Sequence, residues 1–119
     1  MALSSKRPRW DIYETVILLE GYLETLQGIQ SKSQIIKRIS ADLRRMAVNR
    51  GVEIDDVYRN ENGVSYQIQS MDSAFKGQKV YVPATKLFTD AVALYRTDNE
   101  GYQKILGEAK GMITVKKNS

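Results

Sequence analysis

Residues 11–28 read DIYETVILLEGYLETLQG, and their pattern decides the fold class. Apolar side chains recur at steps of four and three residues, at Ile12, Val16, Leu19, Leu23 and Leu26. This spacing places them along one side of an α-helix. Asp11 and Glu14 have the spacing of a capping box, which predicts where the helix starts, and Gly28 predicts where it ends.

The helical periodicity continues through most of the chain. Ser31 is the predicted cap of a second helix, whose apolar residues are Ile36, Ile39, Leu43 and Met46. The pattern predicts further helices over residues 63–75 and 84–95, and a last one capped by Asp98 or Asn99. We therefore predict an all-α fold, a small bundle of about five helices.

Length and composition indicate one soluble domain. The chain has 119 residues, of which 42% are hydrophobic and 27% charged, close to ordinary globular usage. We expect a basic arm over residues 1–9, a single helical domain over 10–113 and a flexible basic tail over 114–119. No apolar run approaches the roughly 18 residues of a membrane span. The expected location is therefore cytoplasmic, with no membrane partner.

Catalysis by this chain is not expected. The sequence contains no histidine and no cysteine, which excludes zinc sites built on them, thiol nucleophiles and imidazole bases. Glu108 and Lys110 match part of a nuclease E-x-K pattern, but two residues apart on a predicted helix they lie on different faces. There is no phosphate-binding loop. We predict no catalytic residue, no metal site and no cofactor.

The charge distribution favours a polyanionic partner. The formal net charge is +4. Residues 31–50 carry a local charge of +5 (six bases, one acid), whereas residues 51–75 carry −4 (one base, five acids). The predicted DNA-phosphate contacts are Lys6, Arg7, Arg9, Arg44, Arg45 and Arg59. Alternatively these charges solvate helix exteriors, and Arg59 pairs with Asp55 or Asp56.

The third predicted helix offers a polar outer face. With its apolar stripe turned inward, the outward residues are Asn62, Tyr66, Gln69, Ser70 and Ser73. Amide side chains pair bidentately with adenine in the major groove. We predict base contacts by Asn62, Tyr66, Gln69 and Ser73. The alternative is that these are ordinary solvent-facing residues and that at least one of Asn60 and Asn62 caps the helix.

Three stretches carry a resemblance to a known family. Trp10 and Glu14 precede the first apolar helix, residues 59–68 read RNENGVSYQI, and an apolar helical pattern follows over residues 87–106. Together they resemble a Myb/SANT-like helical domain of bacterial restriction and defence proteins, found fused to HNH nucleases and helicases. In that domain the third helix opens with R-N-x-N-G.

The resemblance implies a helix-turn-helix core and DNA handling, with the third helix as the reading element. Its motif positions here are Arg59, Asn60, Asn62 and Gly63. No nuclease or helicase motif accompanies them, which is consistent with a stand-alone adaptor or a piece of a larger protein.

The leading hypothesis is a non-catalytic DNA-binding module. Its third helix would enter the major groove of double-stranded DNA, and the basic arm and second helix would hold the phosphates. A nuclease or helicase partner is a further possibility. The alternative is a protein-interaction adaptor or inhibitor domain in phage–host defence, which would dock a basic partner through the acidic residues 53–61 and Tyr66.

Overall fold

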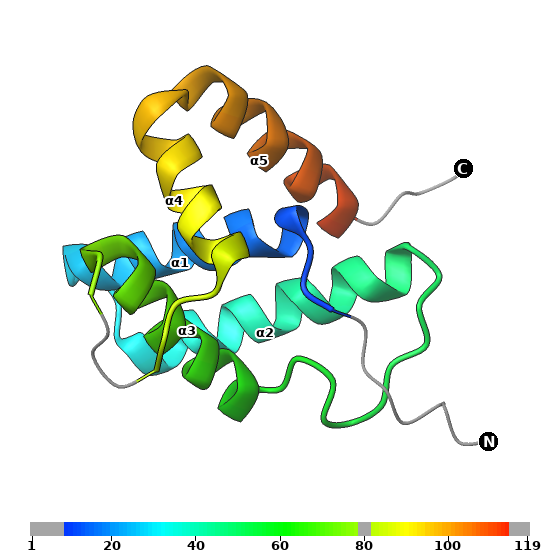
Figure 1. The fold of residues 1–119 in the computed structure, drawn as a ribbon. Helices are drawn as coiled ribbons and strands as arrows, with labels where there is room; N and C mark the ends of the chain where they lie inside the picture. The colour runs from blue at the N-terminus through cyan, green and yellow to red at the C-terminus, as the bar shows by residue number, and fades with distance from the viewer. Residues whose placement is uncertain (1–8, 79–81, 115–119) are drawn as a thin grey trace.

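The computed structural model describes residues 9–78 and 82–114, and within them the chain forms five α-helices and no strand. α1 spans Ile12–Gln27, α2 Lys32–Asn49, α3 Glu61–Lys76, α4 Lys86–Thr97 and α5 Asn99–Ile113. Figure 1 shows α1 in the middle of the molecule, with α2 and α3 on one side and α4 and α5 on the other. The predicted all-α bundle of about five helices is confirmed.

The helices start at capping side chains. Asp11 accepts a hydrogen bond from the Glu14 N–H at 2.9 Å, and the Glu14 carboxylate accepts one from the Asp11 N–H at 3.2 Å. This confirms the predicted capping box of α1. Ser31 caps α2 as predicted, because its hydroxyl accepts a hydrogen bond from the Gln34 N–H at 3.1 Å.

Two predicted boundaries are shifted by the caps that the chain uses. α3 begins at Glu61, two residues before its predicted start, because Asn60 is the cap and accepts from the Gly63 N–H. α4 covers Lys86–Thr97 instead of 84–95, because Thr85 caps it. Of the two candidates for the start of α5, Asp98 is the cap.

α1 is the central helix of the bundle and contacts each of the other four. Its residues from Glu14 to Leu19 are all buried. A single apolar stripe therefore underestimates its burial, since Ile17 and Leu18 lie in the core beside the predicted positions. Leu26 was predicted in the stripe, but it is exposed at the C-terminal end of the helix.

Gly21 lies where α1 closely approaches α2. A Cβ on Gly21 would be 2.3 Å from Cδ1 of Ile39, a core side chain that is only 1% exposed. We expect Gly21→Ala to lower the free energy of unfolding by about 1–3 kcal/mol, the usual effect of overpacking a core. Urea denaturation measures this change.

Gly107→Ala in α5 is the matched control for Gly21→Ala. Nothing lies within 4 Å of the added Cβ, so we expect a gain of about 0.5–1 kcal/mol from the better helix propensity of alanine. If both variants were equally stable, the close approach of α1 and α2 would not constrain residue 21.

The segment before α4 crosses the outer side of α3. The Ser70 hydroxyl donates a hydrogen bond to the Pro83 carbonyl at 2.8 Å, and the Ser73 hydroxyl donates one to the Val82 carbonyl at 2.7 Å. Figure 1 shows the approach to α4 lying across α3. The C-terminal half of the α3 face that was predicted to point outward is therefore covered.

The helix-turn-helix core predicted within the bundle is not confirmed. Residues 50–60 separate α2 from α3, whereas a helix-turn-helix motif uses a turn of about 3–4 residues. This connector is fixed to α2 by side chains. The Arg44 guanidinium donates to the carbonyls of Asp55 and Tyr58 at 3.1 and 2.6 Å, and the Ser40 hydroxyl donates to the Arg59 carbonyl at 2.7 Å.

Candidate nucleic-acid interface

Arg59, predicted as a phosphate contact, lies in the interior. Its side chain is 6% exposed and forms an ion pair with Glu14, whose side chain is 3% exposed. Arg59 Nε donates to Glu14 Oε2 at 2.8 Å, and Arg59 Nη2 donates to Oε1 at 3.2 Å. The guanidinium carbon also lies 4.7 Å from the ring centre of Trp10 and 4.5 Å from that of Tyr58. The phosphate prediction for Arg59 is wrong, because this guanidinium holds a buried carboxylate.

The other motif residues are also accounted for mainly by the fold. Asn60 caps α3, and a Cβ on Gly63 would lie 3.2 Å from the capping oxygen of Asn60. Arg59 has a left-handed backbone conformation with φ of 45°, which turns the chain into the cap. Of the four positions carried over by the resemblance, only Asn62 presents its side chain at the surface.

Ser73, predicted as a base contact, is also buried. It is 2% exposed, and its hydroxyl donates to the Val82 carbonyl. The base-contact prediction for Ser73 is wrong, because the segment before α4 covers it. Ser70, on the same side of the helix, is 1% exposed and donates to the Pro83 carbonyl. Small hydroxyl side chains at these positions let a second backbone segment pass close to α3.

The remaining predicted base contacts form an open surface on the N-terminal part of α3. Asn62 and Tyr66 are exposed and Gln69 is half-buried. Tyr66 is 54% exposed, a high value for so large an apolar ring. None of the three side chains makes a hydrogen bond, ion pair or ring contact with another described residue. Their donors and acceptors are therefore available to a partner.

The predicted phosphate contacts on α2 differ in their surroundings. Arg44 is half-buried, and its guanidinium is used to hold the connector. Arg45 is exposed, near Asp42. Burial raises the pKa of Asp42, and the positive charges of Arg38 and Arg45 oppose that rise.

Of the predicted arm, the structure describes Arg9 alone. Arg9 is exposed. Lys6 and Arg7 lie outside the described residues, and so does most of the predicted tail.

Two lysines that sequence reasoning did not select lie beside the open surface. Lys32 and Lys37 of α2 are exposed, and neither makes a hydrogen bond or ion pair with another described residue. Lys32 lines a hollow together with Asn62 and Ser65 of α3. The signal in the sequence was the local positive charge of residues 31–50, but that charge does not distinguish these lysines from the four arginines in the same stretch.

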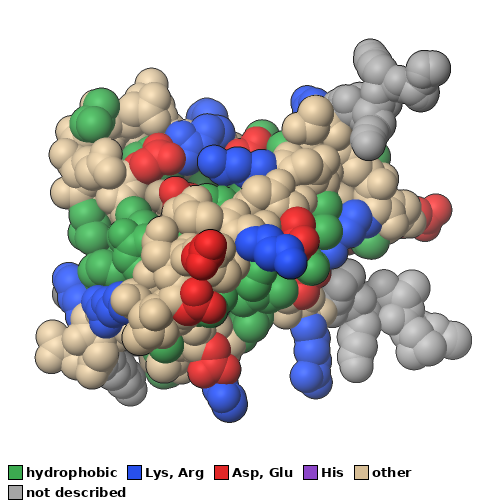
Figure 2. Space-filling view, turned by 90° about the horizontal axis from the view of Figure 1, so that it is seen from above, with side chains coloured by type: hydrophobic (Ala, Val, Ile, Leu, Met, Phe, Trp, Pro, Cys, Tyr) green, Lys and Arg blue, Asp and Glu red, His purple; other side chains and the backbone are tan. Residues whose placement is uncertain are grey.

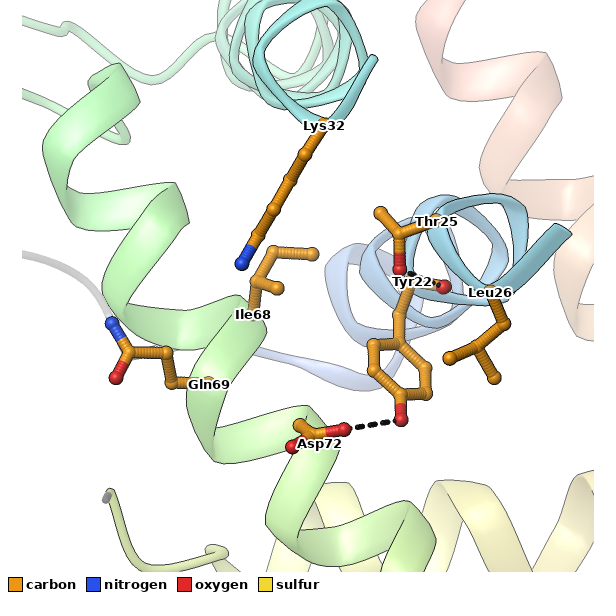
Figure 3. Close-up of a pocket in the computed structure, with 7 residues that line it drawn as sticks. All are labelled: Tyr22, Thr25, Leu26, Lys32, Ile68, Gln69 and Asp72. Carbon is orange, nitrogen blue, oxygen red and sulfur yellow. Dashed lines mark hydrogen bonds between the residues drawn. The ribbon is translucent and has the colours of Figure 1, made fainter. Parts of the chain in front are cut away.

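Three adjoining hollows follow the line where α2 meets α3. The first lies among α1, α2 and α3, and Figure 3 shows Lys32 extending from α2 toward Ile68 of α3, with Asp72 further along the same helix. Lys32 is shared with the second hollow, and Glu61 is shared by the second and the third, which reaches Lys37 and Arg44. The open α3 surface thus continues into a furrow along α2.

Carboxylates also lie along this furrow. Glu61 and Asp56 are exposed, and neither has an ion-pair partner among the described residues. Asp72 is different, because it accepts a hydrogen bond from the Tyr22 hydroxyl at 2.5 Å and pairs with Lys76 at 3.2 Å. Burial, together with the hydrogen bond to Asp72, raises the pKa of Tyr22. Glu61 and Asp56 are therefore the carboxylates that would oppose a phosphate here.

The face formed by α4 and α5 has a different character. Figure 2 shows Lys and Arg side chains interspersed with Asp and Glu side chains on the face seen from above. Lys86 and Asp90 pair across one turn of α4 at 2.8 Å. Mixed charges of this kind give no field of one sign for a polyanion. The α2–α3 side is therefore the stronger candidate.

The described residues contain no group of three acidic, histidine or cysteine side chains placed to hold a metal ion. In the same part of the chain, no helix has both the length and the apolar character needed to cross a membrane. No protein-family model matches the chain, and no curated protein or solved structure matches it either.

Proposed function

We propose that this chain is a non-catalytic DNA-binding module that reads double-stranded DNA with the open part of α3. The base-reading residues are Asn62, Tyr66 and Gln69, and Lys32 and Lys37 of α2 neutralise phosphates beside them. The observation that carries the proposal is that these five side chains have no partner among the described residues, while Lys32 lines hollows with Asn62 and Gln69, and Lys37 lines one with Glu61 of α3. Amide side chains commonly contact base edges, and ammonium groups commonly contact phosphates.

The side chains on α3 match base edges chemically. An Asn or Gln amide both donates and accepts, so it pairs with N6 and N7 of adenine. The exposed phenol of Tyr66 adds a donor, an acceptor and a flat ring. Arg45 and Arg9 are exposed and extend the set of phosphate contacts. A Myb/SANT-like ancestry agrees with this function and stays a prediction.

The rival function is a protein-interaction adaptor. The observation that favours it is the exposed part of the connector, where Glu53, Asp55 and Asp56 precede Val57, which is 48% exposed. An acidic segment with an exposed apolar side chain suits a basic protein partner.

Selection from a random duplex library at low and moderate salt separates the two functions. A DNA-binding module enriches a defined site, and its affinity falls with salt by about 0.9 log units per log unit of salt for each neutralised phosphate. Gln69→Ala should relax the preference at one base pair while other positions keep theirs. If no site is enriched, or if the affinity does not change with salt concentration, the proposal is contradicted. Capture of one stoichiometric protein without any DNA shift supports the adaptor.

Removing the charge of Glu61 should strengthen DNA binding. This carboxylate lines the hollows that also contain Lys32 and Lys37, so it repels phosphates held there. We expect Glu61→Gln to raise affinity about fivefold at low salt, the effect of about 1 kcal/mol between unit charges 4 Å apart in water. Fluorescence anisotropy measures it.

Glu108→Gln is the matched control, because Glu108 is also exposed but lies on α5. It changes the net charge by the same amount. An equal gain of affinity in both variants would mean that only the net charge of the chain matters. It would contradict the assignment of DNA binding to the α2–α3 surface.

A further inference from the structure

A hollow among α1, α2 and α3 adjoins the proposed reading surface. Its volume is about 360 Å³, at the lower end of the roughly 300–1,000 Å³ typical of small-molecule sites. Figure 3 shows α1 contributing Tyr22 and Leu26, α2 contributing Lys32, and α3 contributing Ile68 and Asp72. It is therefore large enough for one small ligand.

The lining combines apolar walls with two opposite charges. Leu26 is 54% exposed and supplies apolar surface at the mouth, whereas Ile68, which is 2% exposed, lies at the floor of the hollow. The Lys32 ammonium has no ion pair with a described residue. Oδ1 of Asp72 accepts the Tyr22 hydrogen bond and pairs with Lys76, and Oδ2 of the same carboxylate is the acceptor offered to a ligand. A flat, partly apolar ligand with an anionic group and an N–H donor matches this lining.

We propose that this hollow binds a single nucleotide. Its phosphate pairs with Lys32, the face of its base lies against Leu26 above the buried Ile68, and an exocyclic amino group donates to Asp72. The inference rests on the proposed DNA-binding function, because Gln69 belongs both to the reading surface and to the rim of the hollow. The same chemistry is offered by a free nucleotide and by an unpaired nucleotide extruded from a DNA duplex.

The test compares two sources of nucleotide with the full chain. One arm measures binding of a perfect duplex and of the same duplex with one bulged cytosine. The other titrates free cytidine monophosphate and thymidine monophosphate while amide NMR shifts are recorded. We expect the bulged duplex to bind about tenfold more tightly than the perfect one. Thymidine monophosphate, which has no exocyclic amino group, should bind more weakly than cytidine monophosphate.

Leu26→Trp fills the mouth of the hollow at an exposed position, so the fold is retained. We expect it to remove the preference for the bulge and leave the affinity for the perfect duplex within about twofold. Ile29→Trp is the control, because Ile29 is 80% exposed in the neighbouring turn and does not line the hollow. This control should keep both affinities.

The outcomes separate the nucleotide site from the proposed function. Salt-dependent binding of the perfect duplex, with no preference for the bulge and no shifts from either nucleotide, overturns the site and leaves the function standing. Binding of cytidine monophosphate that Leu26→Trp abolishes, without duplex binding, assigns the hollow to free nucleotides and refutes the function. Retention of the bulge preference in Leu26→Trp overturns the site.

Discussion

Replacing Arg59 with methionine is expected to lower the free energy of unfolding by about 3–5 kcal/mol. The substitution leaves the Glu14 carboxylate buried with a side-chain exposure of 3% and without its guanidinium. It also removes a cation held against the rings of Trp10 and Tyr58. Chemical denaturation monitored by circular dichroism measures the change.

The exposed pair of Arg38 with Glu24 provides the control. Its geometry is as good, with bonds of 2.8 and 3.0 Å, but both side chains are about 40% exposed. Arg38→Met should therefore lower stability by less than about 1 kcal/mol. Adding Glu14→Gln to Arg59→Met should recover part of the loss, since no charge is then left buried. Equal effects of Arg59→Met and Arg38→Met would refute the assigned role of Arg59.

Neutralising Lys32 and Lys37 together is expected to weaken duplex binding about a hundredfold near 0.1 M salt. Each phosphate contact contributes about 0.9 to the slope of log affinity against log salt, which amounts to roughly tenfold at that concentration. The double variant Lys32→Gln/Lys37→Gln should therefore also flatten the salt dependence by about 1.8. Anisotropy titrations at several salt concentrations give both quantities.

The matched double variant is Lys104→Gln/Lys110→Gln, on exposed positions of α5. It removes the same charge from a face where both signs are mixed. We expect its salt slope to equal that of the unaltered chain. If the salt slope fell equally in both double variants, binding would not be confined to one face of the bundle.

Local signals allowed the helices to be predicted. The capping box at Asp11 and Glu14, the cap at Ser31 and the glycine at residue 28 each depend on side chains within a few positions. Interactions of that range are visible in a sequence. The start of α3 was displaced because Asn60 and Asn62 are both good caps, and sequence spacing alone does not choose between them.

The errors in the site came from contacts between distant segments. Arg59 was expected to meet Asp55, Asp56 or a phosphate, but its partner is 45 residues away, on α1. A helical wheel treats the side opposite the apolar stripe as solvent-facing, and Ser73 lies on that side. The backbone near Val82 covers it, a tertiary contact that periodicity does not encode.

The resemblance motif has a structural explanation. Trp10, Glu14 and Arg59, which mark it, meet where the half-buried Trp10 ring covers the buried Glu14–Arg59 pair, and Asn60 and Gly63 form the cap of α3. The motif therefore indicates how the first and third helices are joined. Whether α3 contacts DNA depends on other residues, namely those at 62, 66 and 69.

Serine hydroxyls hold the non-helical backbone on both sides of α3. Ser40 of α2 binds the Arg59 carbonyl just before the helix, and Ser70 and Ser73 of α3 bind the carbonyls of Pro83 and Val82 after it. Positions 62, 66 and 69 take no part in this fastening. Their identities can therefore change with little effect on folding. The bundle is thus suited to diversification, because new recognition surfaces can be built on α3 while the scaffold that presents them stays the same.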